Sequence, residues 1–262
     1  MRIACVAAVT LALLAAADAS AAQTSTPLPS VRVVHDRFIA ALGGAPAILR
    51  PRSMTIRGYY DIHGRNGKTT RVQFVTYAAD YRQLEIDTIR GREAGRSGYE
   101  DGVGWSLAPG AQPQIAKGAA LLSARRDADI YYWAHISEYF SSMNVVGIEL
   151  FAGHRCYHLS GITVWGNKNE HYFDARTGLL VGYAFHQWNA SGTGREPAVT
   201  RQVLDDYRNF AGLLIPMRFT TYEGSRRINQ LQNLSIQFDN VDDRVFTLPA
   251  SVKAAPKSLR SV

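Results

Sequence analysis

Most of the chain alternates hydrophobic and polar residues with a period of two, which is typical of β-strands that bury one face. In the first such segment one face carries Met54, Ile56, Tyr60 and Ile62. The opposite face carries Thr55, Arg57, Tyr59, Asp61 and His63. The Gly-Arg-Asn-Gly sequence at 64–67 then predicts a hairpin turn. The alternation recurs in the following places: Val72 with Phe74, Leu84 with Ile86, around Trp105, Val145–Phe151, Arg155–Val164, Glu170–Phe173, Leu179–Trp188, and near Val199–Phe210, Leu214–Tyr222 and Arg227–Phe238. This pattern predicts an antiparallel meander of about ten strands.

Two segments depart from the period of two. Ser30 is placed to cap a helix whose apolar positions from Val31 to Leu42 follow helical spacing, and Gly43-Gly44 ends it. Residues 109–142 contain an Ala- and Leu-rich stretch, Gly118–Ala128, followed by the aromatic run Ile130–Phe140. Aromatic residues three and four positions apart form one helical face, so we expect these residues to form helical material that covers the sheet. We also expect the aromatic run to be a movable cover, with permanent core packing as the alternative.

The N-terminus has the organisation of a cleavable signal peptide. Arg2 gives a positive start, Ile3–Ala17 an apolar stretch, and Ala19–Ala22 a small-residue cleavage site. The apolar stretch is shorter than the roughly 20 residues that a membrane-spanning helix needs. We therefore expect a signal peptide at residues 1–22, export to the periplasm, a linker at 23–29, one domain at 30–249 and a loose basic tail at 250–262.

Composition and charge narrow the class of protein. Apolar residues make up 46% of the 262 and charged residues 19%, which excludes extended disorder and a coiled coil. The formal charge of +7 is spread along the whole chain, an arrangement unlike the clustered basic stripe of a nucleic-acid-binding protein. A diffuse positive surface fits anionic lipid head groups or an anionic envelope.

The chain carries no recognisable catalytic signature. It contains no G-x-S-x-G, H-E-x-x-H, P-loop or C-x-x-C motif, so we expect neither an enzyme nor a cofactor. The nearest candidate for chemistry is the alternating set His154, Cys156 and His158, with His171 and His186 on neighbouring strands. A metal site fits this spacing, but strand histidines are common, so no metal is the prediction. Removal of Cys5 with the signal peptide leaves Cys156 without a partner, and we expect it to stay reduced as a small hydrophobic residue.

Four sequence segments carry a resemblance to a known superfamily: Arg37–Gly44, Gly153–Leu159, Tyr172–Leu180 and Val245–Pro249. Over residues 30–249 the chain resembles the bacterial outer-membrane lipoprotein-sorting proteins, the LolA/LolB-like superfamily. The resemblance implies an α+β, mostly antiparallel fold, in which a curved and unclosed β-barrel carries helices over its concave face.

The resemblance also implies a function in binding or carrying lipid, or the acyl chains of lipoproteins. Each buried methylene contributes roughly 0.8 kcal/mol, so one long chain suffices as a binding determinant. We expect the following side chains to line the cavity: Met54, Ile56, Tyr60, Phe74, Leu84, Ile86, Trp105, Leu121, Trp133, Tyr157, Leu159, Phe219, Leu234 and Ile236. Plain core packing is the alternative for each of them. Two other functions stay open, namely an envelope sensor or scaffold that binds a protein partner in the half-barrel, and a hydrolase without a recognisable motif.

Overall fold

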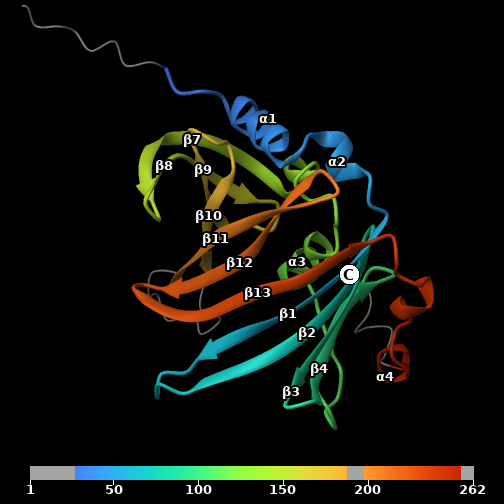
Figure 1. Ribbon diagram of the computed structural model, residues 1–262. Coiled ribbons are helices and arrows are strands. Elements are labelled where there is room, and N and C mark those ends of the chain that lie inside the picture. Colours follow the sequence, from blue (N-terminus) through green and yellow to red (C-terminus); the bar gives the residue numbers. More distant parts are fainter. Residues whose placement is uncertain (1–26, 188–197, 255–262) are drawn as a thin grey trace, which may run out of the picture.

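A single antiparallel sheet of thirteen strands dominates the computed structural model, which describes residues 27–187 and 198–254 (Figure 1). The predicted signal peptide therefore lies outside the described residues. The strands are β1 (Ser53–His63), β2 (Thr69–Ala79), β3 (Arg82–Ile89), β4 (Arg92–Glu100), β5 (Val103–Leu107), β6 (Gln114–Ile115), β7 (Phe140–Phe151), β8 (His154–Thr163), β9 (Lys168–Asp174), β10 (Leu180–Gln187), β11 (Ala198–Phe210), β12 (Leu213–Glu223) and β13 (Arg226–Phe238). Their order in the sheet is β6-β5-β4-β3-β2-β1-β13-β12-β11-β10-β9-β8-β7. The sheet is not closed, because β6 and β7 remain at its two edges, as expected for a half-barrel.

Helices are few and short in the described part of the chain. They are α1 (Val31–Leu42), α2 (Ala45–Leu49), α3 (Ala119–Asp127), α4 (Ala250–Ala254) and the 3₁₀ turns η1 (Ile136–Tyr139) and η2 (Asp243–Phe246). The predicted start of α1 is confirmed, because the Ser30 side chain accepts a hydrogen bond from the Val33 amide at 3.3 Å. Gly43 ends the helix with φ +120°, a conformation that glycine adopts at little cost. None of the described helices has the length and hydropathy needed to cross a bilayer.

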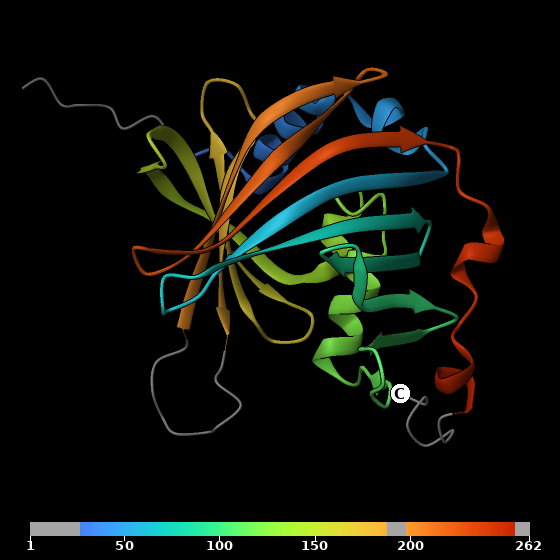
Figure 2. The same cartoon turned by 60° about the horizontal axis from the view of Figure 1, so that its bottom comes forward.

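One end of the sheet is covered by α1. Val34, Phe38 and Leu42 of this helix are buried against strand residues of β8 to β12, such as Leu159 and Phe173. We call this covered side the inner face and the opposite side the outer face. Figure 2 shows the curved sheet with α1 and α3 within its curve. The inner face thus holds the larger hydrophobic core at the α1 end.

The other end of the sheet is covered on both faces. On the inner face α3 packs on β4 and β5, with Leu121 as its one buried residue. On the outer face Val252 of α4 is completely buried against Val103 and Trp105 of β5. The sequence predicts a loose tail from Ala250, and this is wrong for Ala250–Ala254, because the apolar Val252 closes an otherwise exposed strip of sheet.

The sheet differs from the sequence prediction in several places. It is not one continuous meander, because β1 pairs with β13, and the short strand β6 lies in the segment 109–142 that is expected to be helical. The strand β4 does not show in the sequence pattern, because Gly95 and Gly98 replace the apolar residues that mark other strands. The expected strand at Val145 begins five residues earlier, at Phe140, where polar residues hide the period. Register shifts interrupt several strand pairs, for example between Arg57 and Gly58, and such bulges bend and twist a sheet.

The aromatic run after α3 is not the helix that the spacing predicts. Only Ile136–Tyr139 is helical, as the single turn η1, whereas the preceding residues form turns. Buried Asp129 organises the segment by accepting hydrogen bonds from the Tyr131 amide at 2.9 Å and from the Tyr139 hydroxyl at 2.8 Å. The Asp129 carboxylate also lies 2.9 Å from His135 Nδ1. A buried carboxylate with several partners fixes irregular backbone without a helix, because each hydrogen bond replaces a contact with water.

Candidate functional site

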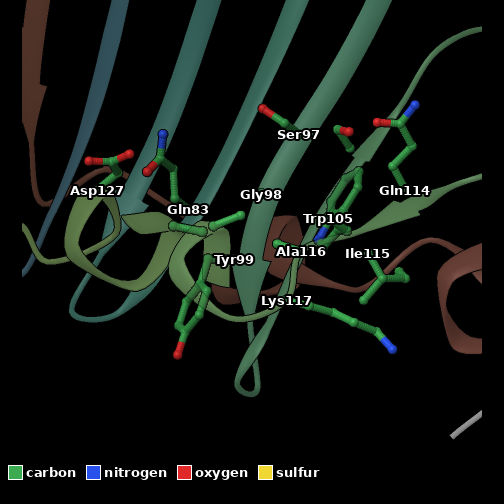
Figure 3. A pocket seen from close by; sticks show the side chains of 13 residues that line it. Gln83, Ser97, Gly98, Tyr99, Trp105, Gln114, Ile115, Ala116, Lys117 and Asp127 are labelled. Carbon is green, nitrogen blue, oxygen red and sulfur yellow. The ribbon is translucent and has the colours of Figure 1, made fainter. Parts of the chain in front are cut away.

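A cavity of about 420 Å³ lies between α3 and the strands at the β6 edge of the sheet (Figure 3). Its helical wall contains small side chains, including Ala120 and Ala124. Its strand wall contains Ser97, Gly98 and Ser106, which are also small. These small side chains on both walls leave the space open, and the larger Tyr99 and Trp105 border it without filling it.

A row of polar side chains crosses the inner face at this end. The register pairs Thr76 with Glu85, Glu85 with Ser97, Ser97 with Ser106, and Ser106 with Gln114, across five neighbouring strands from β2 to β6. We call these five residues the polar row. Three of them, Ser97, Ser106 and Gln114, line the cavity. An inner face is normally apolar, so five consecutive polar positions distinguish this end of the sheet from the α1 end.

Two carboxyl groups of β3, those of Glu85 and Asp87, lie on the inner face at this end and have raised pKa values. Burial raises the pKa of Glu85 above its ordinary value, and a hydrogen bond from Thr76 only partly offsets this effect. The negative charges of Asp87 and Asp127 act in the same direction as burial. Burial also raises the pKa of Asp87, whose Oδ2 accepts a hydrogen bond from the Tyr60 hydroxyl at 2.8 Å. In both carboxyl groups burial therefore opposes the charged form.

The middle strands bring together five of the predicted lining residues. Met54, Ile56 and Tyr60 share the inner face of β1, with Ile236 of β13 paired to Ile56 and Phe74 of β2 close to Tyr60. The Tyr60 and Phe74 ring centroids are 6.2 Å apart. These strands lie between the parts of the sheet that carry the main helix contacts, which are α1 with β7 and β12 and α3 with β4 and β5. These five side chains form an apolar strip in the middle of the inner face, in which Phe74 and Ile236 are buried, and contact of the strip with a ligand stays a prediction.

Another five predicted lining residues belong to the packed core. Trp133, Tyr157, Leu159 and Phe219 are all part of the α1 core, and Leu121 anchors α3. Leu159 is completely buried between strands and helix. Binding of a ligand by these residues stays a prediction, and the structure places them in contact with protein.

The remaining four predicted lining residues do not lie on the inner face. Leu84 and Trp105 pack on the outer face with Val252, and Ile86 shares the face of Leu84. Trp105 nevertheless borders the cavity at the sheet edge. The side chain of Leu234 is 63% exposed, because a bulge in β13 places it out of register with β1. The expected inward orientation of these four side chains is wrong, since alternation fixes which residues share a face but not which face the helices cover.

The histidine cluster lies on the outer face, away from the cavity. As predicted, His154, Cys156 and His158 share one face, whereas buried His171 lies on the inner face against Trp133. His158 Nδ1 is 3.2 Å from Glu149 Oε1, and its ring stacks on Tyr172. Among residues 27–187 and 198–254 no group of three or more His, Cys, Asp or Glu side chains is arranged to hold a metal ion.

Cys156 is a free and completely buried thiol within the outer-face cluster. Burial raises the pKa of Cys156 to about 12, and the negative charge of Asp174 adds to the effect. The thiolate that a nucleophile or a metal ligand requires is therefore disfavoured at neutral pH. This environment is that of a structural cysteine.

Sequence comparison gives no assignment for this chain. No family model matches it, and no curated protein matches it.

Structural comparison assigns the fold. A LolA superfamily protein from Nitrosomonas europaea superposes with a TM-score of 0.60 at 12% identity, covering 84% of this chain and 99% of that one. A DUF1329 family protein from Desulfovibrio piger superposes with a TM-score of 0.58 at 13% identity, covering 83% of this chain and 97% of that one. A putative outer membrane lipoprotein-sorting protein domain from Vibrio parahaemolyticus superposes with a TM-score of 0.55 at 10% identity, covering 80% of this chain and 92% of that one. The chain therefore has a LolA-like fold in the broad sense, and at these identities the likeness concerns the fold alone.

Proposed function

We propose that this protein is an exported, non-enzymatic binding or carrier protein for amphiphiles of the cell envelope, namely lipids or the acyl chains of lipoproteins. The observation that carries the proposal is the apolar strip on the inner face of β13, β1 and β2. Helices α1 and α3 have their main contacts on either side of this strip, and Ile62 at its open end is 44% exposed. An acyl chain laid along the strip buries apolar surface at about 25 cal/mol per Å².

The signal-like N-terminus and the LolA-like fold support the same proposal. A carrier of lipid must leave the cytoplasm to act in the envelope, and two structural neighbours are a LolA superfamily protein and a putative outer membrane lipoprotein-sorting protein domain. N-terminal sequencing of the exported protein tests this part. A mature chain that begins near Gln23 supports export, whereas an intact Met1 on the mature protein contradicts it.

Two adjacent tyrosines provide a matched test of binding on the inner face. Tyr60 faces the apolar strip, whereas Tyr59 lies on the outer face beneath the guanidinium of Arg71, 3.9 Å from its ring centroid. Titration with a fluorescent fatty acid should show weaker binding by Tyr60→Ala and unchanged binding by Tyr59→Ala. Equal effects of the two substitutions, in proteins of equal thermal stability, would exclude the strip as the acyl site.

The second candidate function, a sensor or scaffold for a protein partner, is favoured by the sheet edge at β7. This twelve-residue edge strand exposes Val146, Ile148 and Leu150, and the side chain of Leu150 is 76% exposed. An exposed apolar edge strand offers main-chain groups to an added strand. Native mass spectrometry of protein purified from its own envelope discriminates between the two. Lipid that co-purifies supports the carrier, and a stoichiometric polypeptide supports the scaffold.

A further inference from the structure

The cavity under α3 differs in chemistry from the apolar strip beside it. Gln83 of β3, Ser97 of β4, Ser106 of β5 and Gln114 of β6 all line it. Figure 3 shows Gln83, Ser97 and Gln114 on the same side of the cavity. Within the described residues none of these four side chains hydrogen-bonds to another part of the protein. Their amide and hydroxyl groups are therefore available to a molecule inside the cavity.

An acyl chain is a poor occupant for this cavity. A polar group that loses water and gains no partner costs about 1–3 kcal/mol, whereas a buried methylene contributes about 0.8 kcal/mol. Gln83, Ser97 and Ser106 are partly buried, so their loss of water would offset much of what a chain gains there. The occupant must itself bring hydrogen-bond donors and acceptors.

The charged groups around the cavity restrict the chemical class of its ligand further. Asp127 lines the cavity, so a phosphate or carboxylate head group would meet its negative charge. Lys117 also lines the cavity, and Arg126 binds Asp127 with a nitrogen–oxygen distance of 2.6 Å, so the site is not purely acidic either. Mixed hydroxyl and amide groups with an aromatic side chain, Tyr99, match a ligand that is uncharged and rich in hydroxyl groups.

We propose that the cavity under α3 binds the neutral, hydroxyl-rich head group of an amphiphile, of the saccharide or polyol class, while its chain lies on the apolar strip. The polar row links the two parts, because it runs along one level of the sheet from Thr76 on β2 to Gln114 on β6. Thr76 pairs with Ile56 of the strip, so head and chain would be neighbours on one continuous surface. This inference rests on the proposed function and gives its ligand a chemical class.

Three amphiphiles of one chain length separate the contributions of head and chain. The probes are dodecyl maltoside, dodecyltrimethylammonium and laurate, each titrated below its micellar concentration and followed by calorimetry. We expect dodecyl maltoside to bind at least tenfold more tightly than the other two. Equal affinity for all three probes would overturn the head-group site and leave the carrier proposal intact.

Variants locate the site. Gln114→Leu and Ser97→Val should each weaken binding of dodecyl maltoside by about fivefold to tenfold and leave laurate binding unchanged. The matched control is Gln73→Leu on the exposed outer face of β2, which should change neither. Unchanged maltoside binding by both cavity variants, with unchanged thermal melting, would overturn the proposal.

Free maltose distinguishes failure of this inference from failure of the proposed function. Binding of maltose that is lost in Gln114→Leu, without binding of any dodecyl amphiphile, would support the head-group site and refute the carrier function. Absence of binding for every probe would refute both.

Discussion

Trp133 decides whether the aromatic segment after α3 is a movable cover or part of the core. Its ring lies among three others, with centroid distances of 5.1 Å to Phe38, 4.7 Å to Tyr132 and 6.4 Å to His171. Burial of roughly 150–200 Å² of such a ring at about 25 cal/mol per Å² corresponds to about 4–5 kcal/mol. Because part of the ring stays exposed, we expect Trp133→Ala to lower the free energy of unfolding by about 3–4 kcal/mol.

Urea unfolding followed by far-ultraviolet circular dichroism measures this loss without relying on tryptophan fluorescence. Leu150→Ala on the exposed β7 edge is the control and should change the free energy of unfolding by no more than about 0.5 kcal/mol. A loss below about 1 kcal/mol for Trp133→Ala, together with altered affinity for a fluorescent fatty acid, would refute core packing and establish the movable cover. A large loss with unchanged lipid binding per folded molecule would refute the cover.

Three further predictions concern buried groups and backbone. Burial lowers the pKa of His171 to about 3, so the free energy of unfolding should fall as pH drops below about 6.5, by up to ~1.4 kcal/mol per pH unit. Urea titrations at several pH values should show that this free energy depends less steeply on pH in His171→Phe. Equal pH dependence in the two proteins would contradict the prediction. The Cys156 thiol should react with a disulfide reagent at pH 8 at least about a hundredfold more slowly in folded than in unfolded protein, and rapid labelling of the folded form would disprove its burial. Gly178 has φ +78°, and an added Cβ would lie 3.0 Å from the Arg37 carbonyl oxygen, so Gly178→Ala should cost about 2–3 kcal/mol in thermal or urea unfolding. Gly166→Ala, at φ +89° with open space around it, should cost only about 1–2 kcal/mol, and equal costs would show that the contact with α1 contributes nothing.

The sequence predicted the structure correctly where residues close together in the chain determine it. Ser30 and Gly43 identified both ends of α1, and the turn at 64–67 identified the first hairpin. Capping and turn formation depend on side chains within a few residues of one another, so the sequence holds all the information they need. The sequence resemblance to the LolA/LolB-like superfamily also agrees with the fold found by structural comparison.

The sequence did not predict the strand β4 or the irregular structure of the aromatic segment. The glycines Gly95 and Gly98 remove the period from β4, and its place is fixed by pairing with β3 and β5. The spacing of the aromatic run favours a helix, yet Asp129 gathers the hydrogen bonds of an irregular turn instead. In both cases tertiary contacts override the local preference, because their combined energy exceeds a propensity of a few tenths of a kcal/mol per residue.

The sequence by itself determined which side chains share a face, since alternation is a property of each strand alone. Met54, Ile56 and Tyr60 were therefore correctly grouped. Only the tertiary structure decided which face becomes the inner one, and it places Leu84 and Trp105 on the outer face beneath α4. It alone also revealed the polar row, because that row joins one residue from each of five strands. Cross-strand register depends on pairings between distant parts of the chain, and no local period encodes them.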